Sequence, residues 1–300
     1  MSERGAVASR VDPPPTGSQL NASASVENGP LRDLRSHASR LVVATTQLVI
    51  FVVFLLCWQF LPTIPWLSSR FKFLDSFFIS SPTHVIECMA DLARGSDGSP
   101  LIWGYIGRTL SSSLIGTAIG ILAGGAFGLI LSNSDFWSRV LTRYLNMLNA
   151  VPRIAIVPIF IILLGPTSSA SIAVAVTVVF FVCFFNAYEG GRAVPLHLVQ
   201  NAKVLGASQR QVMTRVRLPY VTAWTMASIP VAIAFALTTV VTAELLSGVD
   251  GIGQLVAQAS FTSNATLTFA IVMYLAVVGA SVVALAQLVS RRILHWWGKA

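Results

Sequence analysis

Long apolar stretches separated by short polar loops dominate the chain from about residue 41 onward. A helix needs about 20 apolar residues to cross the hydrocarbon core of a bilayer. Six stretches meet this length, at about 41–61, 108–132, 142–165, 168–188, 221–246 and 266–289. The pattern therefore predicts an all-α polytopic membrane protein with six transmembrane helices.

Composition supports this prediction. Hydrophobic residues make up 54% of the 300 residues and charged residues only 11%, against about 25% charged in soluble domains. The net charge of +8 could suggest nucleic-acid binding, but the basic residues lie in short loops between apolar spans, as membrane topology requires. Three scattered cysteines without a CxxC pair argue against a disulfide framework or a zinc site.

The first 38 residues have a different composition. They contain the run Val-Asp-Pro-Pro-Pro-Thr-Gly-Ser from Val11 and show no apolar periodicity, so we expect a disordered tail over 1–38. No short apolar core ends there in a small-residue cleavage site, which argues against a signal peptide. The remainder divides into a first span with its outer loop (39–103), the main membrane domain (104–290) and a basic tail (291–300).

The basic residues also predict an orientation. With the amino terminus inside, 15 of the 20 Lys and Arg residues fall on the cytoplasmic side. Because positively charged loops remain in the cytoplasm, both termini are expected there.

Small residues and prolines distinguish individual spans. Gly116, Gly120, Gly124 and Gly128 recur every four residues and line one helical face, which allows close helix approach. That face could pack within one subunit or form a dimer seam. Prolines at 152, 158 and 230 each remove a backbone donor, so the third and fifth spans are either walls of a pathway or bent structural helices.

The loop between the first two spans holds a short helix of its own. Ser81 and Pro82 suit its start and Gly95 its end. Its apolar stripe suggests that it lies on the membrane surface. His84 and Cys88 are four residues apart, but no further ligands lie nearby, which argues against a metal site.

The basic loop at 200–219 carries a helix-turn-helix pattern. Gly206 is suited to end the first helix in a left-handed cap. Ser208 and Gln211 form a capping-box pattern that opens a second helix, and we expect Pro219 to close the element where the fifth span begins. An interfacial helix touching anionic lipid is the alternative explanation for the charges, but it does not require the Gly-Ala-Ser hinge.

This loop resembles the EAA loop of ABC-importer permeases. Gly206, nine residues, then Val216, Arg217, Leu218 and Pro219 match the end of that motif. At the front only Ala202 matches, because Gln200 and Asn201 replace the usual Glu and first Ala. Over about 60–297, further segments resemble the nitrate, sulfonate and taurine branch, which includes permeases for thiamine precursors: Ser81-Pro-Thr, Ala150-Val-Pro-Arg-Ile-Ala-Ile-Val-Pro, Phe180-Phe-Val-Cys-Phe-Phe-Asn and Thr242-Ala-Glu-Leu-Leu-Ser-Gly.

The resemblance implies a type I ABC-importer permease in a bacterial cytoplasmic membrane. Its loop would be a coupling helix that docks on a cytoplasmic ATPase subunit, present in two copies. An extracytoplasmic solute-binding protein would deliver the solute to a permease homodimer. The coupling residues would be Ala202, Gly206, Ala207, Ser208, Val216, Leu218 and Pro219. ATP would be used only by the partner, because this sequence has no phosphate-cradling Gly-rich loop with lysine and is expected to bind no cofactor.

Arg153, Pro158 and Glu244 are candidate pathway residues. Arg153 lies inside a span, where a charge is a functional candidate. It could meet an anion, snorkel, or pair with a carbonyl freed by Pro158. Glu244 precedes the Gly-rich stretch 247–253, which is either a flexible outer gate or a plain turn.

Three functions are compatible with the sequence. The first is the membrane subunit of an ATP-driven importer for a small anion or another small nutrient. The second is a secondary transporter driven by an ion gradient, although no convincing inverted repeat is visible. The third, an intramembrane enzyme, is the weakest, because the sequence has no GxSxG, HExxH or membrane-embedded carboxylate pair.

Overall fold

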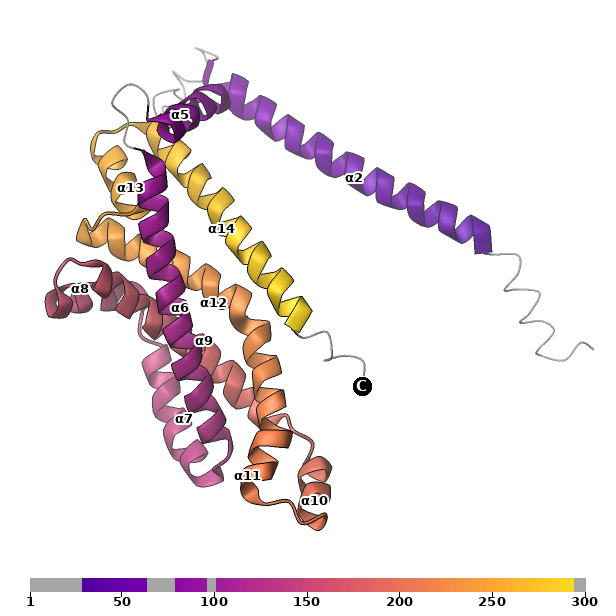
Figure 1. Ribbon diagram of the computed structural model, residues 1–300. Coiled ribbons are helices and arrows are strands. Elements are labelled where there is room, and N and C mark those ends of the chain that lie inside the picture. The colour runs from indigo at the N-terminus through magenta and orange to yellow at the C-terminus, as the bar shows by residue number, and fades with distance from the viewer. Residues whose placement is uncertain (1–28, 64–78, 96–100, 294–300) are drawn as a thin grey trace, which may run out of the picture. The chain divides into compact units, whose positions relative to one another are not determined.

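The computed structural model describes residues 29–63, 79–95 and 101–293. All regular elements in these ranges are helical (Figure 1). The chain divides into two compact units, Met1–Leu61 and Pro62–Ala300. The first holds α2 (Gly29–Phe60), and the second holds α5 (Pro82–Arg94), α6 (Ile102–Ser132), α7 (Asp135–Asn149), α8 (Arg153–Leu164), α9 (Ser168–Arg192), α10 (Leu196–Val204), α11 (Gln209–Val212), the π-helical segment η3 (Met213–Arg217), α12 (Leu218–Ser247), α13 (Ile252–Phe261) and α14 (Ala265–Ile293).

Within the described residues, five helices are long and apolar enough to span a membrane, counting Gln209–Ser247 as one run. The other four are Val42–Phe60 in α2, α6, α9 and α14. The third predicted span is different: 142–165 is not one straight helix, because α7 and α8 meet at 87°. Pro152, the N-cap of α8, interrupts the helix at this bend, since proline disfavours helical backbone in the residue before it.

The amino-terminal helix is also longer than predicted. It begins at Gly29, inside the segment 1–38 that composition predicted to be disordered. Pro30 lies in its first turn, where the missing backbone donor carries no penalty. The rest of that predicted tail lies outside the described residues.

The core of the second unit is the packing of α6, α9 and α12. Gly116, Gly120, Gly124 and Gly128 are buried on the face of α6 that meets α9 of the same chain. A Cβ atom on Gly124 would lie 2.4 Å from the Phe180 carbonyl oxygen. These glycines therefore set a helix separation that no larger residue allows.

The short helix α5 begins and ends as predicted, after Ser81 and before Gly95, which has a φ of 68°. Its stripe is covered by protein rather than lipid, because α5 packs on α14: the Tyr274 hydroxyl donates to the Met89 carbonyl at 2.7 Å, and Val85 and Leu92 are buried. Burial and the nearby Asp91 carboxylate raise the pKa of Cys88. Within the described residues, no three His, Cys, Asp or Glu side chains are grouped to hold a metal.

Several candidate functional residues lie at two ends of this unit, which we call the loop end and the turn end. At the loop end lie α10, α11, the start of α12 and the ends of α6 and α9 (Figure 1). The turn end, at the opposite end of α12, holds the start of α6, α13 and α5 (Figure 1).

Candidate functional site

The loop end is built by local sequence signals. α10 ends beside Gly206, which adopts a φ of 82°, the left-handed conformation that glycine tolerates best. The Ser208 hydroxyl accepts a hydrogen bond from the Gln211 amide at 3.3 Å, and the Gln211 side chain accepts one from the Ser208 amide at 2.8 Å. The predicted cap and capping box are therefore both present, and they fix the angle between α10 and α11.

The prediction that Pro219 closes this element is wrong. The helix continues from Gln209 to Ser247 through the π-helical segment η3, and Pro219 lies in the first turn of α12. The π turn changes the backbone hydrogen bonding immediately before Pro219, where a regular helix would need the missing proline donor. The loop is thereby joined to α12 without a flexible break.

Arg217 fastens the same segment to another helix. Its guanidinium donates to the Asn133 side-chain oxygen at 2.6 Å and to the Ser132 carbonyl at 3.3 Å. Both acceptors lie at the end of α6, where a positive charge also complements the helix dipole. A displacement of the loop would therefore act on α6 and α12 together.

The surface of the loop is unusually apolar. Val204 and Leu205 are each 86% exposed, and Leu196 is 69% exposed. They lie next to Lys203 and Arg210, which are also exposed. We call Leu196, Val204 and Leu205 the loop face. An exposed apolar face bordered by charge is typical of a protein-binding site.

Arg153 lies at the bend between α7 and α8. It is the first residue of α8, its guanidinium lies 5.3 Å from the centre of the Phe235 ring, and it donates to the Asn149 side chain at 3.3 Å. A cavity of about 180 Å³ opens beside it, lined also by Ile154, Val157, Phe235, Thr238, Thr239 and Thr242. Pro158 does not line this cavity. The guanidinium offers hydrogen-bond donors to a small anion, whereas the Thr238 and Thr242 hydroxyls already donate to the Ala234 and Thr238 carbonyls.

Glu244 does not lie in an open pathway. It is 2% exposed, and its carboxylate oxygens accept the Thr109 hydroxyl at 2.8 and 2.9 Å and the Gly253 amide at 3.0 Å. The Thr109 oxygen accepts the Ile252 amide at 2.9 Å. These bonds join α6, α12 and α13, so Glu244 is a positioning residue and not the pathway group predicted from its place in the sequence.

The glycines of the turn end are packed against this carboxylate. A Cβ atom on Gly251 would lie 2.1 Å from the Glu244 carboxyl carbon, and one on Gly253 would lie 2.2 Å from the Val241 carbonyl oxygen. An ion pair between Arg108 and Asp250 adds a contact from α6 to the same turn. Residues 251–253 therefore form a packed turn, whereas Gly248, at the end of α12, is exposed and has nothing within 4 Å of a Cβ atom.

Comparison with known proteins identifies this architecture. Residues 116–295 match the family described as "Binding-protein-dependent transport system inner membrane component". The chain belongs to this family. It is a permease of the ABC-importer type, and its relatives are transport components rather than enzymes.

Relatives of this permease include two from Escherichia coli. The putative aliphatic sulfonates transport permease protein SsuC is 29% identical over 240 residues, which cover 80% of this chain and 87% of that protein. The taurine transport system permease protein TauC is 22% identical and covers 79% and 86%. An inward-facing MetNI methionine ABC transporter chain has the same fold, with a TM-score of 0.56, 18% identity, and coverage of 65% and 95%.

Two functional candidates in this permease were not found from the sequence. Thr109 and Arg217 carry the polar contacts at the turn end and the loop end. Arg217 lies within the EAA-like motif, but at its variable position, and Thr109 belongs to no motif. Only the partners that the fold brings to them, Glu244 and Asn133, reveal their roles.

Proposed function

We propose that this permease imports a small sulfonate-type anion and is driven by a separate cytoplasmic ATPase that binds the loop face. It acts in a bacterial cytoplasmic membrane with the loop end and both chain termini inside. Two ATPase subunits, two copies of this chain and one extracytoplasmic solute-binding protein make up the importer. ATP is used only by the ATPase.

The loop face is the observation that carries this proposal. Three aliphatic side chains are held in water on a helix-turn-helix that is rigid at Gly206 and at the capping box. A short amphipathic helix with such anchors fits an apolar groove on a partner. Because Arg217 and the continuous helix tie this segment to α6 and α12, closure of the partner would move the membrane helices.

Crosslinking tests this proposal. A photo-crosslinking residue at Leu205 should trap the ATPase subunit in membranes that contain the whole importer, whereas the same residue at Leu122 should trap lipid. Leu122 is 73% exposed but lies within the apolar span α6, so it is a matched control. Capture of lipid alone at Leu205 would refute the docking of the ATPase.

The anion class is supported by the cavity at the α7–α8 bend and by the relatives that carry sulfonate and taurine permease names. Phe235, whose ring lies beside the Arg153 guanidinium, is near the middle of α12. A guanidinium at that depth is costly without an anionic or aromatic partner. A passing sulfonate would be such a partner for Arg153.

Replacement of Arg153 tests the anion class. A charge-assisted hydrogen bond contributes about 1.5–3 kcal/mol, so Arg153→Gln should lower uptake of radiolabelled taurine or an alkanesulfonate roughly 10-fold or more, whereas Arg153→Lys should retain part of it. Uptake of the sulfonate within twofold of the native rate in Arg153→Gln would exclude this role. A retained crosslink at Leu205 would then show that the coupling proposal survives without the anion.

A further inference from the structure

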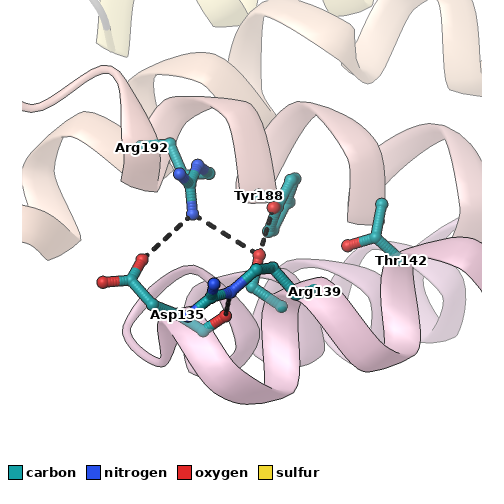
Figure 2. A pocket seen from close by; sticks show the side chains of 6 residues that line it. Asp135, Arg139, Thr142, Tyr188 and Arg192 are labelled. Atoms are coloured by element: carbon teal, nitrogen blue, oxygen red, sulfur yellow. Dashed lines mark hydrogen bonds and ion pairs between the residues drawn. The ribbon is translucent and has the colours of Figure 1, made fainter.

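A second polar cavity lies between two helices at the loop end, outside the loop and away from Arg153. It measures about 570 Å³ and is lined by Asp135, Ser138, Arg139, Thr142, Tyr188 and Arg192 (Figure 2). The first four residues come from the beginning of α7 and the last two from the end of α9. Nothing in the transport mechanism above uses these side chains.

Two guanidinium groups reach this cavity from different helices. Arg192 contacts the Asp135 carboxylate and the Ser138 hydroxyl, each at 3.4 Å, and its guanidinium lies 5.8 Å from the centre of the Tyr188 ring. Arg139 donates through Nε to the Asp135 carbonyl at 3.2 Å. These contacts are long and engage only part of the donors that two guanidinium groups present, so both arginines can bind a further acceptor.

Thr142 points to a missing partner. Its hydroxyl oxygen is buried, lines the cavity, and has no hydrogen-bond partner. A buried polar group without a partner costs about 1–3 kcal/mol. The neighbouring Ser138 and Tyr188 hydroxyls are hydrogen-bonded to each other, and neither is bonded to Thr142. A ligand with an acceptor oxygen would remove this cost.

The charges and the position select the ligand. Two guanidinium groups against the one Asp135 carboxylate leave one net positive charge in the cavity, which matches a singly charged phosphodiester better than a free phosphate dianion. Phe136 and Trp137, on the same first turn of α7, are 65% and 55% exposed. Exposed aromatic side chains mark the depth of lipid headgroups, and basic pockets between membrane helices bind such headgroups.

We propose that this cavity binds the phosphate group of an anionic phospholipid, held by Arg139 and Arg192 and by a hydrogen bond from the Thr142 hydroxyl. The lipid contacts both α7 and α9 and so stabilises α7, the helix that leads to the bend at Pro152. The phosphate site stands on the contacts in Figure 2. With the orientation proposed above, the lipid would belong to the inner leaflet, and only this assignment depends on that orientation.

Native mass spectrometry of the purified full-length permease tests the site. The protein is exchanged into detergent with equal amounts of phosphatidylglycerol and phosphatidylcholine, and the retained lipid is counted. We expect phosphatidylglycerol to be retained preferentially, and Arg139→Gln or Arg192→Gln to reduce that retention roughly 10-fold, as the loss of a charged hydrogen bond predicts. Arg143→Gln is the matched control, because Arg143 is an exposed arginine of α7 that does not line the cavity.

Thr142→Val separates binding from folding. Valine has nearly the same shape and removes the unpaired hydroxyl, so the variant should be at least as thermally stable as the native protein without lipid while retaining several-fold less phosphatidylglycerol. Equal retention by Thr142→Val, Arg139→Gln, Arg192→Gln and Arg143→Gln would overturn the site. Displacement of the retained lipid by millimolar glycerol phosphate would overturn the lipid as the source of the phosphate, and equal retention of the two lipids would overturn the preference for an anionic lipid.

Discussion

Gly251 and Gly206, which lie near opposite ends of α12, are suited to their positions for opposite reasons. At the turn end, Gly251 has a φ of 177°, a conformation open to any residue, yet a Cβ atom there would overlap the Glu244 carboxyl group. At the loop end, Gly206 has open space around it, with nothing within 4 Å of a Cβ atom, but a φ of 82°. The turn end is fixed by tertiary packing, whereas the loop end is shaped by its own backbone.

This difference has a mechanical consequence. The turn end buries its polar groups in a single set of hydrogen bonds across three helices, so it moves only as a block. The loop end buries Val199 and Val212 but leaves the loop face exposed, and Arg217 and the continuous helix tie it to the bundle. If the ATPase binds the loop end as proposed, the hydrogen-bonded turn end would let α12 transmit that motion to α6 and α13.

The largest expected effect of a single methyl group is at the turn end. Gly253→Ala would place Cβ 2.2 Å from the Val241 carbonyl oxygen and 2.8 Å from Glu244 Cβ, so α12 and α13 must separate. Overpacking of this kind lowers the free energy of unfolding by about 1–3 kcal/mol. Because the clash is with a backbone atom, which cannot rotate away as a side chain can, we expect a loss near the upper limit of this range. We expect a clearly lower thermal unfolding temperature and less folded protein in detergent, measured by size-exclusion fluorescence.

Gly107→Ala is the control for this variant. Gly107 lies in α6 with nothing within 4 Å of a Cβ atom, and alanine is favoured over glycine in a helix by about 0.5–1 kcal/mol. Its unfolding temperature should stay the same or rise. Equal unfolding temperatures for the two variants would show that the turn end is not closely packed.

The contrast also explains how much the sequence could reveal. The capping box, the left-handed Gly206 and the bounds of α5 were predictable, because each depends on residues a few positions apart. The Glu244–Thr109 contact was not, because its partners lie 135 residues apart and only the packing of α6 on α12 joins them. Pro152 indicated an interrupted third span, but the 87° turn depends on where α8 finds space beside α9 and α12.

Substitution of Gly206 should destabilise the protein less than substitution of Gly253. Holding a residue with a Cβ atom in the left-handed region costs roughly 1–2 kcal/mol, and the loop can absorb part of this cost by local rearrangement. Gly206→Ala should therefore leave the unfolding temperature of the bundle unchanged while increasing hydrogen exchange of the amides around Ser208. Transport per ATP hydrolysed should fall, because the loop face would no longer hold one orientation.

Substitution by side chains of increasing size distinguishes the effect of backbone conformation at Gly206 from the effect of packing at Gly253. Because the surroundings of Gly206 are open, Gly206→Leu should behave like Gly206→Ala, and Gly206→Asn should be milder, since asparagine tolerates positive φ. At Gly253 the loss must instead grow steeply from alanine to leucine, because the obstacle is the Val241 backbone. A steep dependence on size at Gly206 in the assembled importer would mean that the bound ATPase fills the space beside it, which would place that glycine in the docking interface itself.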